Sequence, residues 1–191
     1  MLPNEPARHL IATMPPLDEA VVRERYGPDA IVRFRGEHGW LSNMEPCSVV
    51  VDGREWPSAE HAYQGQKTEL DAEKELVRRA KTPKAAKSAG KKVTARAGFF
   101  FDAAAKVSDP PVPTDMSRDA MRAVIAAKFE RGSPLAVKLL QTGERPLVEG
   151  NTWNDRTWGV TTTRKRGCSG SNALGLLLME RRAALKAEEP L

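Results

Sequence analysis

The sequence predicts an α+β fold, a helix-rich single domain with a small β-sheet. Its 191 residues, of which 40% are hydrophobic and 29% charged, match the length and composition of one soluble globular domain. β-prone residues concentrate in the range 31–56, on both sides of Asp52-Gly53, a strong hairpin-turn signal. In the range 116–131 apolar residues recur at intervals of three and four, the spacing of an amphipathic helix.

Proline, glycine and capping residues divide the chain into successive elements. Residues 1–30, broken up by prolines, are predicted to form a peripheral N-terminal extension, and residues 31–187 the domain itself. Ser58, Thr82 and Ser133 are each predicted to cap the N-terminus of a helix. In chain order, we expect a helix at 17–26, a strand at 31–34, a turn at 36–39, strands at 47–51 and 54–56, helices from 58 and at 71–80, 82–90, 116–131 and 133–143, an extended segment at 146–149, a loop-rich stretch at 150–170 and a helix from 172.

Composition narrows the class of protein. The formal net charge of +5 and the pI of about 9.4 suit a polyanionic partner such as nucleic acid or a phosphorylated nucleotide. No apolar run reaches the roughly 20 residues that span a bilayer, and the first 16 residues lack the layout of a signal peptide. Cys47 and Cys168 stand far apart, as expected of two free thiols. We therefore expect a cytoplasmic protein with no membrane association and no metal site.

The helix that begins at Ser58 carries the first candidate site. At 3.6 residues per turn, Glu60, Gln64 and Lys67 fall on one stripe of its surface. Glu60 lies in the first turn, where the helix dipole favours an ionised carboxylate. Such a stripe is either a solvated polar face or a carboxylate and an amine that share a site. His61 points away from Lys67 and is predicted to be structural.

Three further segments hold candidate residues. Asn43 follows Trp40 and Ser42 in a loop, where it either closes a turn or binds a sugar or base. Trp153 and Trp158 lie in a glycine-containing loop and either pack on the core or stack on a base. A basic run is either a solvated helix face or an anion-binding patch; it consists of Lys81, Lys84, Lys87, Lys91, Lys92 and Arg96.

Taken together, these segments resemble the NADAR (YbiA-like) family. The resemblance covers about residues 31–185 and rests on motifs that occur in the family's order. Where the family has a tryptophan before its central helix, the nearest candidate here is Phe101. The matching motifs are Trp40-Leu41-Ser42-Asn43, Trp56-Pro57-Ser58-Ala59-Glu60-His61 with Gln64 and Lys67, Ala80-Lys81-Thr82-Pro83 with Ala86-Lys87 and Gly90, Ala127-Lys128-Phe129, Leu140-Gln141-Thr142-Gly143, Leu147-Val148-Glu149-Gly150-Asn151-Thr152-Trp153 with Asp155 and Trp158-Gly159, and Gly170, Asn172, Leu174-Gly175 and Leu178-Met179.

The resemblance implies a YbiA-like fold and an enzyme that cleaves N-glycosidic bonds of ADP-ribose or a related ribosyl nucleotide, without a cofactor. Glu60 would stabilise the oxocarbenium-like transition state. Lys67 would bind a phosphate or form a Schiff base, for which it needs a lowered pKa from burial or a nearby arginine. Asp155 would position water or transfer a proton. The ligand-binding residues would be Trp40, Ser42, Asn43, Gln64, Glu149, Trp153, Trp158, Gly159 and Asn172.

The substrate stays open at this point. One possibility is a hydrolase that removes ADP-ribose from guanine in DNA or RNA and counteracts an ADP-ribosyltransferase toxin. Another is an N-glycosidase acting on a small ribosyl intermediate of the riboflavin pathway. A third is a module that binds ADP-ribose without catalysis. The basic run favours the first possibility.

Overall fold

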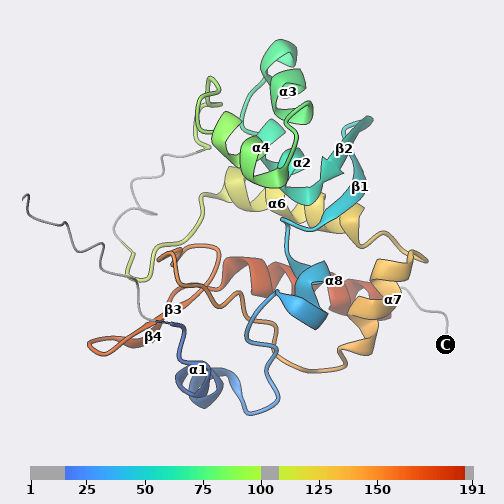
Figure 1. Ribbon diagram of the computed structural model, residues 1–191. Helices are drawn as coiled ribbons and strands as arrows, with labels where there is room; N and C mark the ends of the chain where they lie inside the picture. The colour runs from blue at the N-terminus through green and yellow to red at the C-terminus, as the bar shows by residue number, and fades with distance from the viewer. Residues whose placement is uncertain (1–15, 100–107, 188–191) are drawn as a thin grey trace, which may run out of the picture.

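A computed structural model describes residues 16–99 and 108–187, so the position of Phe101 lies outside the described residues. It confirms the helix-rich α+β class, with most helices near their predicted positions (Figure 1). In chain order the elements are α1 (Glu19–Tyr26), the 3-10 helix η1 (Gly36–Leu41), β1 (Pro46–Val51), β2 (Arg54–Ser58), α2 (Ala59–Gly65), α3 (Asp71–Arg78), α4 (Pro83–Ala89), α6 (Asp115–Lys128), α7 (Pro134–Gln141), β3 (Thr161–Thr163), β4 (Gly167–Ser169) and α8 (Ala173–Ala187).

The predicted sheet is wrong in its extent. Strands β1 and β2 form the expected antiparallel hairpin, with Asp52 and Gly53 at φ 52° and 69° in its turn. The predicted strand at 31–34 is a single bridge, because only Ile31 pairs with the segment at 147 before the chain turns away into η1. A second hairpin, β3–β4, lies in the stretch expected to be a loop. Its strands are only three residues long, too short for a visible alternation of apolar and polar residues.

The core surrounds α2, every residue of which is buried. This helix packs against α3, α4 and α6 and against the β1–β2 hairpin, all of which lie in the upper half of Figure 1. Gly65 lets α2 approach Trp56, since a Cβ atom there would lie 2.0 Å from the indole ring. Complete burial rules out one of the two alternatives for the polar stripe of α2, a solvated face.

The described part of the N-terminal extension packs onto a second, smaller apolar cluster. Leu17 and Val22 are buried there with Val148 and Val160. Helix α1 also contacts β4, and the Arg25 guanidinium donates to the Cys168 carbonyl at 2.8 Å. The segment from residue 17 onwards is therefore attached to the lower half of the molecule (Figure 1).

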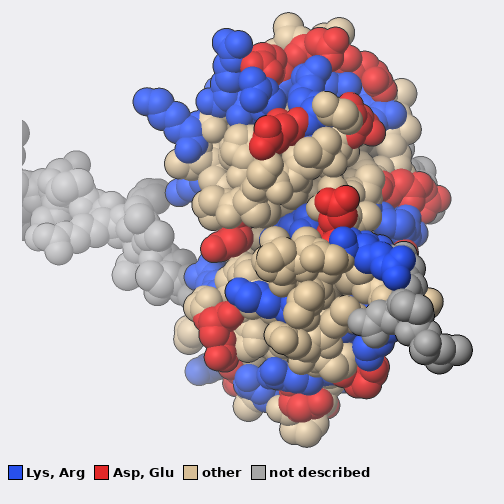
Figure 2. All heavy atoms as spheres, turned by 90° about the vertical axis from the view of Figure 1, so that its right-hand side faces the viewer, with Lys and Arg blue, Asp and Glu red and all other residues tan. Residues whose placement is uncertain are grey.

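The surface mixes charges of both signs. On the face shown in Figure 2, lysine and arginine side chains are interspersed with aspartate and glutamate, and large uncharged areas lie between them. Cys47 and Cys168 are free thiols. Among residues 16–99 and 108–187, no helix is both long and apolar enough to cross a membrane.

Candidate functional site

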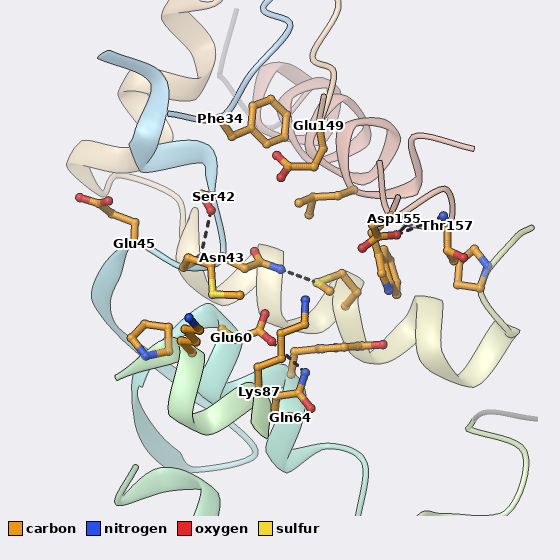
Figure 3. A pocket seen from close by; sticks show the side chains of 18 of the residues that line it. Phe34, Ser42, Asn43, Glu45, Glu60, Gln64, Lys87, Glu149, Asp155 and Thr157 are labelled. Carbon is orange, nitrogen blue, oxygen red and sulfur yellow. Dashed lines mark hydrogen bonds between the residues drawn. The ribbon is translucent and has the colours of Figure 1, made fainter. Parts of the chain in front are cut away.

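A pocket of about 1230 Å³ opens between α2 and α4 on one side and the segment from Glu149 to Trp158 on the other (Figure 3). It brings together nine of the predicted site residues, which come from three separate parts of the chain. They are Ser42, Asn43, Glu60, Gln64, Lys67, Glu149, Trp153, Asp155 and Trp158. Pockets for drug-sized ligands span roughly 300–1000 Å³, so this one has room for a ligand with several parts.

Helix α2 supplies the carboxylate and the amide. Ser58 caps the helix as predicted, and its hydroxyl accepts from the His61 N–H at 3.3 Å. The Gln64 amide donates to Glu60 Oε1 at 2.8 Å, which fixes the carboxylate within the pocket. The helix dipole was expected to favour the ionised form of Glu60, but the pKa of this carboxyl group shifts in the opposite direction. Burial raises the pKa of Glu60, and the nearby Lys87 and Lys67 only partly oppose this effect.

His61 has the structural role that was predicted. Its Nδ1 lies 2.7 Å from the Ser58 hydroxyl, and its Nε2 lies 3.0 Å from the Ala80 carbonyl. Both ring nitrogens are therefore engaged in joining α2 to the end of α3. The side-chain amide oxygen of Gln64, Oε1, is in contrast buried with no hydrogen-bond partner among the described residues.

Lys67 lies just beyond α2, in a turn in which its N–H donates to the Gln64 carbonyl at 3.3 Å. Only 7% of the residue is exposed, and its ammonium group lies 5.4 Å from the centre of the Tyr63 ring. Burial lowers its pKa to about 8 despite the nearby Glu60 carboxylate, while Lys87 and Lys91 lower it further. The lowered pKa required of a lysine nucleophile is thus present, and its causes are burial and lysines rather than an arginine.

The segment after η1 forms another wall. The Asn43 carbonyl accepts the Glu60 N–H at 3.0 Å, so this segment is tied to the first turn of α2. The Asn43 amide lies 3.1 Å from the Met121 sulfur and faces the pocket (Figure 3). Lys128 is buried in α6 and donates to the Ser42 carbonyl at 2.6 Å. The backbone on both sides of Asn43 is therefore fixed.

The segment opposite α2 carries two more carboxyl groups. Asp155 Oδ1 accepts the N–H groups of Thr157 at 3.1 Å and of Trp158 at 2.9 Å, which shapes the loop. Glu149 lies across the cavity from Glu60 in Figure 3. Burial, followed by the charge of Asp155, raises the pKa of Glu149 to about 7. Glu60, Glu149 and Asp155 thus line one cavity with different surroundings.

The two loop tryptophans differ in their surroundings. Trp158 packs edge-on against Tyr63, with ring centres 5.5 Å apart, and also contacts the core. Trp153 is 46% exposed at the pocket wall, and the Arg35 guanidinium lies 5.2 Å from the centre of its ring. Trp158 thus packs on the core, as one of the two alternatives predicted, and also lines the pocket, while Trp153 presents an exposed indole at the pocket wall.

Three predicted ligand-binding residues lie outside the pocket lining. Trp40 packs against Phe129 within the core. Gly159 faces backbone, since a Cβ there would lie 2.2 Å from the Glu149 carbonyl. The Asn172 side chain donates to the Leu147 carbonyl at 2.9 Å and accepts the Glu149 N–H at 3.0 Å. These residues support the wall rather than form it.

Reasoning from the sequence missed several residues of the wall. Lys87 was placed in the basic run, yet it extends from α4 toward the cavity (Figure 3). Tyr63 of α2 also lines the pocket, and its hydroxyl is hydrogen-bonded to the Ser117 hydroxyl at 2.7 Å. Arg35 carried no signal. Lys84 and Lys87 are about one helical turn apart, and this spacing could have placed both side chains on one face of the helix that ends near Gly90.

A cavity with opposed carboxyl groups, a lysine of lowered pKa and aromatic walls defines the candidate active site of a small α+β enzyme. The chain belongs to the NADAR domain family, whose profile matches residues 33–186. It is 35% identical over 164 residues to "N-glycosidase YbiA" of Shigella sonnei, which covers 84% of this chain and 92% of the relative.

Two further comparisons agree. The chain is 33% identical over 153 residues to "Riboflavin biosynthesis protein VVA0006" of Vibrio vulnificus, covering 80% of this chain and 37% of that protein. The NMR structure of the E. coli protein YbiA matches with a TM-score of 0.65 and 30% identity, over 85% of this chain and 90% of that one. The fold is therefore that of YbiA, and the enzyme class is that of hydrolases of N-glycosyl compounds.

Proposed function

We propose that this protein hydrolyses the N-glycosidic bond of an ADP-ribosyl group attached to guanine in nucleic acid. The observation that carries the proposal is the pocket itself, in which Glu60 and Lys67 share one cavity with two tryptophans. Cleavage of a ribose–nitrogen bond builds positive charge on the sugar, and a carboxylate held beside the sugar stabilises that charge. Glu60 is fixed by Gln64 in a way that suits this role.

Lysine side chains support an anionic substrate. Lys84 and Lys87 line the pocket from α4, and Lys67 lies at the end of α2. A pyrophosphate has two negative charges that such ammonium groups neutralise. The volume of about 1230 Å³ accommodates a dinucleotide-sized ligand together with a base. Trp153 would stack on one of the bases at the wall.

Two roles fit Lys67. As an ammonium ion it would bind a substrate phosphate. As a neutral amine it would attack the anomeric carbon of the opened ribose, release the base and leave a Schiff base that water then hydrolyses. With a pKa of about 8, roughly a tenth of the amine is neutral at pH 7. Asp155 would position that water, since its other contacts hold the loop beside Trp158.

A specific finding favours a second candidate function. One relative is named a riboflavin biosynthesis protein, so a ribosylated pyrimidine of that pathway is an alternative substrate. In that case the phosphate would be a single 5′-phosphate and part of the pocket would remain unfilled. Action on nucleic acid would also pair this enzyme with an ADP-ribosyltransferase toxin, whereas action on a flavin precursor would not.

The test compares both substrates. An oligonucleotide carrying ADP-ribosylated guanine is incubated with the protein, and free ADP-ribose is measured by mass spectrometry. We expect release by the wild type and a loss of at least a hundredfold in Glu60→Gln. Turnover of the ribosylaminopyrimidine phosphate alone would select the second function. ADP-ribose binding without turnover of either substrate would select a non-catalytic binding module.

A matched variant controls for charge at the pocket. Glu45→Gln removes a carboxyl group that also lines the cavity but lies at its exposed edge. We expect this variant to retain turnover within about threefold of the wild type. Full activity in both Glu60→Gln and Lys67→Ala would refute the assignment of the catalytic helix.

A further inference from the structure

We propose that Glu149 is a second catalytic carboxyl group, the general acid that protonates the departing base. The inference rests on the proposed function, because it concerns the same pocket and the same bond. Sequence reasoning gave Glu149 only a binding role. Its backbone, its surroundings and its place opposite Glu60 support a role in proton transfer.

The backbone of Glu149 is fixed from both sides. Its N–H donates to the Asn172 side chain at 3.0 Å, and its carbonyl accepts the Val160 N–H at 2.9 Å. Gly159 packs so closely that a Cβ atom there would lie 2.2 Å from the same carbonyl. Asn172 itself adopts φ 50°, a left-handed conformation that asparagine tolerates well. Gly159 and Asn172 together hold the backbone of Glu149 in place, and a proton donor requires such a fixed position.

The surroundings of the Glu149 carboxyl group favour its protonated form. Glu149 Oε2 is buried and has no hydrogen-bond partner among the described residues. The ring of Phe34 lies beside it (Figure 3). Asp155, from its own loop, adds to the effect of burial, while Arg35 before η1 and Lys87 on α4 oppose it. Burial and Asp155 prevail, so the neutral acid is present near neutral pH.

Glu60 differs from Glu149 in its partners. The Gln64 amide donates to it, so at least one of its oxygens acts as an acceptor. Burial raises the pKa of Glu60 as well, but Lys87, Gln64 and Lys67 act against burial and favour the ionised form. Two carboxyl groups on opposite sides of one cavity, one held by an amide donor near Lys67 and one beside an apolar ring and another acid, are suited to different tasks. One stabilises positive charge on the sugar, and the other supplies a proton.

The proposed step balances as follows. The bond between the anomeric carbon and the base nitrogen breaks, and its electron pair goes to that nitrogen. The nitrogen takes the proton of the Glu149 carboxyl group, and the base leaves as a neutral molecule. A water oxygen then bonds to the anomeric carbon, and the proton it releases returns to the Glu149 carboxylate. The net reaction adds one water, and the enzyme is regenerated.

The experiment measures kcat across pH 5 to 9 for the wild type and for Glu149→Gln, on whichever of the two N-ribosyl probes the wild type turns over. We expect the variant to lose roughly 10²–10⁴-fold in kcat and to retain its Kd for ADP-ribose. The wild type should lose activity as the pH rises through about 7, where Glu149 ionises. That decline should be absent in Glu149→Gln, since a merely structural role would not remove it. Glu45→Gln is the matched control.

A kcat of Glu149→Gln within tenfold of the wild type, or an alkaline decline that persists in it, would overturn the inference. If Glu149→Gln binds ADP-ribose poorly, the turnover of Glu149→Ala is measured with and without added formate. Recovery of turnover by formate supports proton donation at this position, and no recovery overturns it. A wild type that turns over neither probe would instead refute the proposed function, so the two failures are distinguishable.

Discussion

Replacing Lys67 by methionine should stabilise the fold at neutral pH while it abolishes turnover. Lys67 is 7% exposed, and burial lowers its pKa from 10.5 to about 8. The difference corresponds to about 3 kcal/mol, the cost of holding the ammonium ion in the folded protein. The lowered pKa already includes the attraction of Lys67 to Glu60, which opposes the effect of burial. We therefore expect a net stabilisation of about 1–3 kcal/mol at pH 7.

The pH dependence identifies the cause. Below about pH 8 both the folded and the unfolded wild type carry the Lys67 proton, so the full cost is present. Between about 8 and 10.5 the folded state releases this proton while the unfolded state keeps it. Wild-type stability should therefore rise through this range relative to the variant. The advantage of Lys67→Met should accordingly shrink as the pH approaches 10.5.

Urea unfolding at pH 7 and at pH 10 measures both quantities. Lys128 also has a pKa lowered to about 8 by burial, but it is present in both proteins, so its contribution cancels in the difference. Lys84→Met, which removes an exposed lysine from the pocket wall, should change stability by no more than about 0.5 kcal/mol. The reasoning is refuted if Lys67→Met is less stable than the wild type at pH 7, or if its advantage is the same at both pH values.

Three other predictions concern the support of the site. Gly90→Ala places a Cβ atom 2.0 Å from Gln64 Oε1, so it should cost about 1–3 kcal/mol in urea unfolding and lower kcat/KM by displacing Gln64 from Glu60. Asn172→Ala removes two hydrogen bonds that hold the glutamate segment and should cost about 2–4 kcal/mol in the same assay; wild-type stability would contradict the supporting role. Borohydride added during turnover separates the two roles of Lys67: a nucleophilic lysine should be trapped with the sugar, as mass spectrometry of peptides would reveal, whereas no adduct would leave Lys67 the phosphate-binding role and an adduct that persists in Lys67→Ala would lie elsewhere.

Local signals predicted the elements that depend on local chemistry. Ser58, Thr82 and Ser133 cap their helices as expected, and each side chain accepts a backbone N–H three residues on. Asp52-Gly53 forms the predicted turn. The β3–β4 hairpin was missed because each of its strands has only three residues.

The site could be predicted only in part, for a physical reason. The spacing of Glu60 and Gln64 places them together because both lie on one short helix. The distance between that helix and Glu149 depends on the packing of segments about 90 residues apart, which no spacing reveals. Trp40 illustrates the difficulty, since its motif resembles that of the family but its ring packs against Phe129 outside the pocket lining.

Burial explains why the polar stripe on α2 calls for a functional role. A solvated helix carries glutamate, glutamine and lysine at little cost, but here all seven residues of α2 are buried. Buried polar atoms in proteins are almost always hydrogen-bonded. Gln64 Oε1 and Glu149 Oε2 nevertheless lack partners among the described residues, and both side chains line the same cavity from different walls. An unpaired amide acceptor on one wall and an unpaired, protonated carboxyl group on the other are suited to a donor and an acceptor of the proposed ribosyl nucleotide, whose binding would recover hydrogen bonds that folding leaves unmade.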